Sequence, residues 1–200
     1  GLTNEDQSVV VTLSGSDIDG DYLVFSLDSD ASNGSVEING TLATYTPNQD
    51  FNGSDSFIFS VSDGELSATA EVTLTIESVN DAPVLASVPD VSFDEDGSGS
   101  TSLSADDVDG DSLEFSITGG SDITATLDGN AVSFSAPADY NGSETFTVSV
   151  TDGELSDSQS ISVTVNAVND APVLAAVGDR VIDEDTELNL LLSAIDIEGD

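Results

Sequence analysis

The sequence FIFSV at residues 57–61 alternates apolar residues along the chain, and EVTLTI at residues 71–76 does the same. Apolar residues at every second position lie on one face of a β-strand, and runs this short are typical of strands that are buried on one side. The pattern recurs 89 positions later, as FTVSV at 146–150 and as SVTV at 162–165. These four runs therefore predict half-buried strands in two copies of one unit.

A third pair of runs, LVFSL at 23–27 and LEFSI at 113–117, alternates in the same way. The predicted core faces are Phe57, Phe59 and Val61, Phe146, Val148 and Val150, Val72, Leu74 and Ile76, Ile161, Val163 and Val165, Leu23, Phe25 and Leu27, and Leu113, Phe115 and Ile117. Asn39-Gly40 and Asp128-Gly129 suit tight hairpins, in which a positive φ is required. We expect an all-β fold of about seven antiparallel strands in each copy, arranged as an immunoglobulin-like β-sandwich.

The octapeptide VNDAPVLA stands at residues 79–86 and again at 168–175. Aligning the two copies brings other motifs into register, with a period of 89–90 residues. These are NEDQS (4–8), DEDGS (94–98) and DEDTE (183–187), DIDGD (17–21), DVDGD (107–111) and DIEGD (196–200), DFNGSDSF (50–57) and DYNGSETF (139–146), and SDGELS (62–67) and TDGELS (151–156). The sequence predicts a tandem array, with residues 1–81 as a repeat without its first strand, 82–170 as a complete repeat and 171–200 as the start of a third.

The charge is strongly one-sided, because 40 acidic residues stand against a single basic one, Arg180. A net charge of −39 disfavours binding to nucleic acid or to anionic lipid, and no stretch of the sequence predicts a membrane span or a signal peptide. Cys and His are absent, which excludes disulfides, thiol catalysis and the usual zinc ligands. Oxygen ligands remain, and these are the ligands that Ca²⁺ and Mg²⁺ prefer.

The acidic residues gather in the recurring motifs, which are predicted to lie in loops at the ends of the sandwich. Several loops together can supply the six to eight oxygens that one Ca²⁺ ion takes. Asp, Asn and Gly are also common in turns for reasons of backbone conformation alone, so each motif taken singly is explained by turn formation. Packing two or three carboxylates together in five motifs of each repeat would destabilise an uncompensated fold, and this favours cation binding.

In this order and spacing the motifs resemble cadherin repeats, and in particular the cadherin-like tandem repeats of large bacterial surface proteins. Such repeats carry a Glu after the first strand, a DxD motif, an LDRE-type motif, an Asp between the last two strands and a DxNDNxP linker. The resemblance covers essentially the whole chain. It implies tandem immunoglobulin/cadherin-like antiparallel β-sandwich repeats with Ca²⁺ at each junction between repeats.

The resemblance also implies a ligand set for each junction. For the first junction these residues are Glu5, Asp50, Asn80 and Asp81 from one repeat and Asp107, Asp109 and Asp152 from the next. For the second junction they are Glu95, Asp139, Asn169 and Asp170, then Asp196 and Glu198. Asp17, Asp19 and Asp63 would face a preceding repeat. Pro83 and Pro172 would stiffen the linker, so the octapeptide would serve as both hinge and ligand site.

The chain departs from the cadherin pattern at several positions. Ser78 and Ala167 replace the first acid of the linker motif, and the linker is one residue shorter. Asn52 and Asn141 stand where the LDRE motif has Glu, and Glu198 replaces an Asp. With fewer charged ligands, we expect one to three ions at each junction.

These features predict a calcium-rigidified stalk segment of a large extracellular bacterial adhesin, whose partners are the neighbouring repeats of the same chain. The alternative is an adhesive module that binds a cell-surface glycan or protein directly. Glycan sites usually expose aromatic rings, whereas Phe51 and Tyr140, beside the Asn-Gly turns, are expected to anchor the core. Paired carboxylates can hydrolyse glycosides, but each pair here is better explained as a ligand set, so no enzymatic activity is expected.

Overall fold

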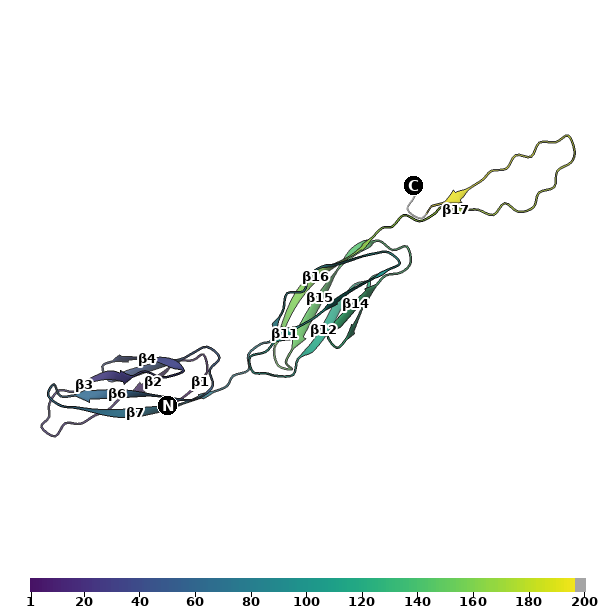
Figure 1. Cartoon of the computed structure of the whole chain (residues 1–200). Helices are drawn as coiled ribbons and strands as arrows, with labels where there is room; N and C mark the ends of the chain where they lie inside the picture. Colours follow the sequence, from purple (N-terminus) through teal and green to yellow (C-terminus); the bar gives the residue numbers. More distant parts are fainter. Residues whose placement is uncertain (197–200) are drawn as a thin grey trace. The chain divides into compact units, whose positions relative to one another are not determined.

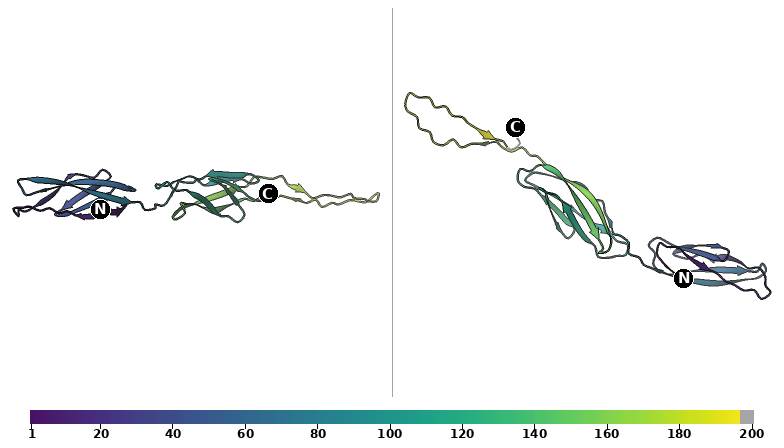
Figure 2. Two further views of the ribbon diagram at one scale, coloured as in Figure 1. Left: turned by 90° about the horizontal axis from the view of Figure 1, so that it is seen from below. Right: turned by 180° about the vertical axis from the view of Figure 1, so that it is seen from behind.

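The computed structural model describes residues 1–196 of the chain. The chain divides into two compact units, a first unit of Gly1–Asp81 and a second unit of Ala82–Asp200. Within residues 1–196 all of the regular structure is β-strand, which confirms the predicted all-β class. Each unit has two layers of strands (Figures 1 and 2).

The first unit is a sandwich of a four-stranded and a three-stranded sheet. The four-stranded sheet has the order β1-β7-β6-β3, and the three-stranded sheet has the order β2-β5-β4. The strands are β1 (Leu2–Asn4), β2 (Val9–Thr12), β3 (Val24–Ser29), β4 (Gly34–Asn39), β5 (Leu42–Pro47), β6 (Gly53–Ser62) and β7 (Ser67–Glu77).

The second unit repeats this arrangement, with sheets β12-β15-β16-β9 and β10-β14-β13. β8 and β11 form a separate two-stranded sheet. The strands are β8 (Val84–Leu85), β9 (Val91–Asp94), β10 (Ser98–Ser102), β11 (Ala105–Asp106), β12 (Glu114–Gly119), β13 (Thr124–Asp128), β14 (Ala131–Ser135), β15 (Gly142–Thr151) and β16 (Ser156–Asn166).

One pairing in each unit is parallel, which the prediction of antiparallel strands missed. β1 runs parallel to β7, and β9 runs parallel to β16. After β1 or β9 the chain leaves the edge of the larger sheet and enters β2 or β10 at the edge of the smaller one. The turn between the two sheets is the Glu-Asp motif, Glu5-Asp6 or Glu95-Asp96. This crossing places the motif at one end of the sandwich.

The alternating residues close the core between the sheets of each unit, as predicted. In the first unit Tyr45, Phe57 and Leu74 are among the buried side chains, and Phe25 and Phe51 pack against them. In the second unit Phe134 and Phe146 meet edge to face with ring centroids 5.3 Å apart, and Tyr140 packs against that core. Phe51 and Tyr140 are therefore core anchors.

The two predicted hairpins form, and in each the turn is two residues long. β4 pairs with β5 from Asn39↔Leu42 onward, and β13 pairs with β14 from Asp128↔Ala131 onward. Gly40 and Gly129 have φ values of 63° and 61°, a conformation that costs glycine little. The two turn residues are Gly40-Thr41 and Gly129-Asn130, so of each predicted dipeptide only the glycine lies in the turn.

A carboxylate near the start of β6 or β15 fixes the loop before β4 or β13. In the first unit the Asp55 carboxylate accepts hydrogen bonds from the backbone N–H groups of Asn33 (2.9 Å) and Ser32 (3.1 Å). In the second unit the matching Glu144 accepts hydrogen bonds from the Ser121 hydroxyl (2.6 Å) and from the N–H of Asp122 (3.1 Å). Each of these two loops is therefore closed by an ionised acid and not by a backbone ladder.

The Glu144 contacts predict a dependence on acid pH. The hydrogen bonds from the Ser121 hydroxyl and from the neighbouring backbone lower the pKa of the Glu144 carboxyl from 4.5 to about 2. Its stabilising effect is complete above pH 4.5 and is lost as the pH falls through about 2. We expect Glu144→Gln to melt below the parent at neutral pH, with the difference closing as the pH approaches 2. Melting curves of both proteins across this range test it, and a constant difference would contradict it.

Beyond β16 the chain begins the pattern again. β17 (Val173–Leu174) pairs with β18 (Ala194–Ile195) as β8 pairs with β11. Leu188, Leu190 and Leu192, which the repeat pattern assigns to a third core, are exposed over 43% or more of their surface. The division of the chain into repeats at 1–81, 82–170 and 171–200 stays a prediction.

Candidate metal centres

The Glu of each Glu-Asp turn is buried, although acids are rarely buried without a partner. Glu5 is 3% exposed and Glu95 is 6% exposed. One carboxylate oxygen of each accepts a hydrogen bond from the linker backbone, from the N–H of Val79 or of Val168, at 2.5 Å. The Glu side chain therefore attaches the linker to its own unit at the end where the octapeptide starts.

In the first unit the Asp of this turn meets two further carboxylates. Oxygen atoms of Asp6, Asp50 and Asp81 all lie within 4.8 Å of one another. The backbone N–H of Asp50 donates to the carboxylate of Asp6 at 3.3 Å, and both residues have φ values near +57° (57° and 56°). Two residues in this uncommon conformation hold the Glu-Asp turn and the loop before β6 against each other.

The second unit has the same arrangement at matching positions. Oxygen atoms of Asp96, Asp139 and Asp170 lie within 4.8 Å of one another, and the N–H of Asp139 donates to Asp96 at 3.4 Å. Desolvation, with the negative charges of Asp170, Asp96 and Glu95, raises the pKa of the Asp139 carboxyl. The cluster therefore carries an electrostatic cost that a cation would remove.

These residues fit a hard divalent cation. Oxygens that all bind one Ca²⁺ ion at about 2.3–2.6 Å lie within roughly 5 Å of one another, as the oxygens of each cluster do. The second carboxylate oxygen of Glu95 is buried and has no hydrogen-bond partner among the described residues. A buried acceptor without a donor is unfavourable, and a bound ion would satisfy it.

Acidic residues of the DxDGD motif lie in the loop that precedes β12. Oxygen atoms of Asp107, Asp109 and Asp111 lie within 4.8 Å of one another, and the N–H of Asp111 donates to Asp107 at 3.2 Å. In the first unit the Asp17 carboxylate accepts from the N–H groups of Asp19 (2.8 Å) and Asp21 (3.1 Å). In each copy the first Asp organises the loop and faces the later ones.

The Asp of each SDGEL or TDGEL motif folds its own turn. The Asp63 carboxylate accepts from the N–H groups of Leu66 and Glu65, both at 2.7 Å, and these bonds lower its pKa. Asp152 accepts from Leu155 (2.7 Å) and Glu154 (2.6 Å) in the same way. Asp63 lines a cavity of about 170 Å³ together with Asp17, so the two motifs meet at one end of the first unit.

The remaining predicted ligands lie in the linkers and in the third segment. The side-chain amides of Asn80 and Asn169 donate to the backbone carbonyls of Asp81 (3.2 Å) and Asp170 (2.9 Å). One carboxylate oxygen of Asp196 is buried without a hydrogen-bond partner within residues 1–196. Glu198 lies outside the described residues.

Sequence reasoning missed three members of these clusters: Asp6, Asp96 and Asp111. It selected the Glu of each Glu-Asp pair and the first two acids of DVDGD, because the family motifs name only those. The signal that could have found Asp6 and Asp96 is the repeat itself, since Asp recurs there in all three copies, at 6, 96 and 185. All three have φ values of 57–60°, where Asp is one of the few tolerated residues.

The buried Glu95 oxygen predicts that Glu95→Gln changes the free energy of unfolding in opposite directions in the metal-free and the metal-bound protein. In EDTA, Glu95→Gln is expected to raise the free energy of unfolding by about 1 kcal/mol, because an amide replaces an unpartnered anionic oxygen. In Ca²⁺ the same variant is expected to be the less stable protein, since it lacks a charged ligand. Urea unfolding of both proteins in the two conditions measures this. A loss of stability in both would contradict it.

The profile of a single family, described as the bacterial Ig domain, matches residues 2–75 and again residues 80–164. The two matches cover most of the chain. The chain belongs to the bacterial Ig domain family. The two consecutive matches confirm the predicted tandem of Ig-like repeats, and the cadherin-like fold is shared with one solved cadherin structure.

Human protocadherin-24 EC1-2 shares the fold of the Ig repeats, with a TM-score of 0.54 and 18% identity over 86% of this chain and 94% of that one. An endo-fucoidan hydrolase of glycoside hydrolase family 107 aligns at 26% identity over 84% of this chain, with a TM-score of 0.36. The chain spans only 27% of that enzyme's length. No curated protein matches the chain. None of the described residues forms a helix that could cross a membrane.

Proposed function

We propose that these Ig repeats form a calcium-rigidified spacer in the stalk of a large extracellular bacterial adhesin. The observation that carries this proposal is the carboxylate cluster at the linker end of each unit, with Glu95 buried beside it and one of its oxygens unpartnered. A repeat that serves as a spacer must be held to the next repeat at its end. The carboxylate cluster at that end can bind a cation that the next repeat also binds.

Each ion in this proposal is shared between one repeat and the next. Glu5, Asp50, Asn80 and Asp81, together with Asp6, would supply one side of the first junction. Asp107, Asp109 and Asp152 would supply the other side, and the second junction would use the matching residues. One to three ions at each junction would neutralise acids that otherwise repel, and the octapeptide would lose its freedom to bend.

The setting follows from the chemistry of the ligands. Mixed carboxylate and amide sites on loops are suited to the Ca²⁺ affinities of extracellular modules, about 10⁻⁴–10⁻³ M. Such sites stay empty in a cytosol that holds little free Ca²⁺. In this proposal the partners are neighbouring repeats of the same chain, and the carboxylates serve as ligands and not as catalytic acids.

Distances between spin labels test whether Ca²⁺ stiffens the chain. The protein has no Cys, so Glu37→Cys and Ser116→Cys would place one label on an exposed strand of each unit. We expect a broad distance distribution in EDTA and a narrow one in Ca²⁺. Asp109→Asn should keep it broad in Ca²⁺, whereas Glu71→Gln, which removes a charge from the exposed sheet surface, should not. Equal widths in EDTA and Ca²⁺ would refute the spacer mechanism.

A further inference from the structure

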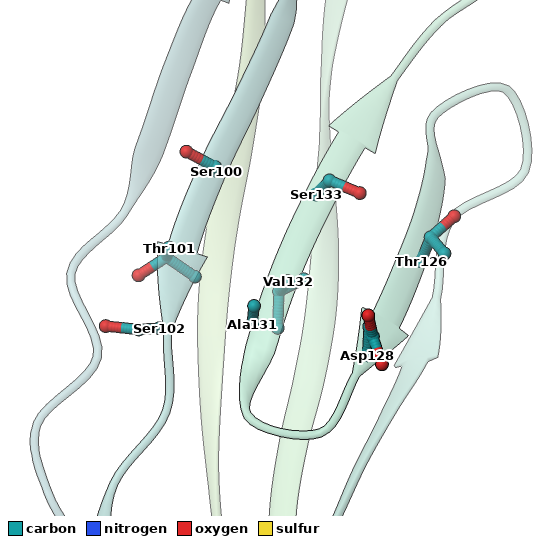
Figure 3. Close-up of a pocket in the computed structure, with 8 residues that line it drawn as sticks. All are labelled: Ser100, Thr101, Ser102, Thr126, Asp128, Ala131, Val132 and Ser133. Carbon is teal, nitrogen blue, oxygen red and sulfur yellow. The ribbon is translucent and has the colours of Figure 1, made fainter.

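The smaller sheet of the second unit has an outer face of hydroxyl groups. Strand register places Ser100, Ser133 and Thr126 in one row across β10, β14 and β13, and Ser102, Ala131 and Asp128 in the next. Figure 3 shows these side chains along the three strands, with Ala131 beside the turn that joins β14 to β13. The face is hollowed into an open groove of about 460 Å³.

The polar groups of this groove are not used by the fold. Within residues 1–196 the side chains of Ser100, Ser102, Thr126, Asp128 and Ser133 make no hydrogen bond to protein. Some exposed hydroxyl groups elsewhere on the molecule pair with one another. Ser143 pairs with Ser162 (3.0 Å) on the larger sheet, and Ser8 pairs with Thr46 (2.8 Å) in the first unit. The groove therefore offers donors and acceptors to an outside molecule.

The matching face of the first unit carries larger side chains. Leu42 stands where the second unit has Ala131, and its side chain is 47% exposed over that face. Val10 and Glu37 stand in the positions of Ser100 and Thr126. The small side chain of Ala131 therefore leaves room on this face that the larger Leu42 takes up in the first unit.

Charge and shape indicate the class of molecule that fits. The lining has one carboxylate and no basic side chain on a protein of net charge −39, so anionic ligands are repelled. Hydroxyl groups and a carboxylate complement a ligand that itself presents several hydroxyl groups. The volume of the groove lies within the range of roughly 300–1,000 Å³ that is usual for small-molecule sites.

We propose that the groove on β10, β14 and β13 binds a short segment of a neutral polysaccharide. Two adjacent sugar hydroxyl groups donate to the Asp128 carboxylate, and Ser100, Ser133 and Thr126 exchange hydrogen bonds with the next positions. The sugar lies over the methyl group of Ala131. Without an aromatic platform the single site is weak, so a millimolar concentration of sugar is needed to fill it. This inference is independent of Ca²⁺ binding.

Nuclear magnetic resonance of the whole chain, titrated with neutral hexasaccharides of glucan, mannan and galactan and with a sulfated galactan of equal length, tests the proposal. We expect amide shifts at Ser100, Asp128 and Ser133 with at least one neutral sugar at up to about 10 mM, and none with the sulfated one. Ala131→Leu, which copies Leu42, should weaken binding at least tenfold. Leu42→Ala in the first unit should leave it unchanged.

Each other outcome would overturn the proposal. No shift with any neutral sugar would show that the hydroxyl face is only hydrated. Equal shifts with the sulfated sugar, or shifts that persist in Ala131→Leu, would show contact outside the groove. Both variants change exposed residues, so an unchanged melting temperature confirms that they are folded.

Discussion

In about 10 mM Ca²⁺ the protein is expected to melt roughly 10–20 °C higher than in EDTA. A site with a Kd of about 0.1 mM adds about 2.7 kcal/mol to the free energy of unfolding at this concentration. Each kcal/mol raises the melting temperature of a small domain by about 4–8 °C. This gain in free energy is a large share of a stability of roughly 5–15 kcal/mol. The gain in stability has two sources. The ion removes the repulsion between the carboxylates, and it supplies a partner for the buried oxygen of Glu95.

The clusters account for the selectivity expected of this response. They combine carboxylates from the Glu-Asp turn, the loop before β6 or β15 and the linker, so their oxygens come from three separate segments and not from one regular element. Ca²⁺ accepts irregular shells of six to eight oxygens, whereas Mg²⁺ requires a small octahedron and retains its waters. Mg²⁺ at the same concentration should therefore raise the melting temperature much less.

Differential scanning calorimetry of the 200-residue chain in EDTA, Mg²⁺ and Ca²⁺ at fixed ionic strength measures the effect. Asp50→Asn and Asp139→Asn each remove one carboxylate from one cluster, and each should reduce the Ca²⁺-dependent rise of its own unit. Glu71→Gln is the matched control, since it removes one charge from an exposed strand position. A melting temperature that Ca²⁺ leaves unchanged would mean that the acids are turn residues only.

Period-two alternation was sufficient to predict the fold, because the core of a sandwich needs only that apolar residues return to one face. Phe57, Phe146 and Val148 are 0–1% exposed, as the pattern requires. The Asn-Gly and Asp-Gly hairpins were predictable for an equally local reason, the low cost of a positive φ at Gly40 and Gly129. Both signals lie within a few residues of the structure they determine.

The features that the sequence did not reveal depend on contacts between distant segments. The parallel pairing of β1 with β7 joins residues more than 70 positions apart, and nothing in LTN at residues 2–4 indicates it. The bond from Asp50 to Asp6, which brings the second acid of the Glu-Asp turn into the cluster, spans 44 positions. Sequence spacing can show that such acids recur, but their approach requires the fold.

Asp55→Ala is expected to lower the free energy of unfolding of the first unit by about 3 kcal/mol, because it leaves several donors without an acceptor. The Asp55 carboxylate is 8% exposed. It accepts from the N–H groups of Asn33 and Ser56, both at 2.9 Å, and from the hydroxyl of Tyr45 at 3.0 Å. Burial alone would raise the pKa of Asp55, but these hydrogen bonds lower it.

The hydroxyl of Tyr45 provides the matched control. Tyr45→Phe removes one of the donors and is expected to cost about 1 kcal/mol, since Phe134 fills the corresponding position of the second unit without a hydroxyl. Urea unfolding of the two single variants and of the double variant gives their coupling energy. The double variant should lose less stability than the two single losses together, because Asp55→Ala already removes the bond that Tyr45→Phe deletes. Simple additivity would show that Tyr45 does not depend on Asp55, and the stabilisation of this loop would then rest on the backbone bonds alone.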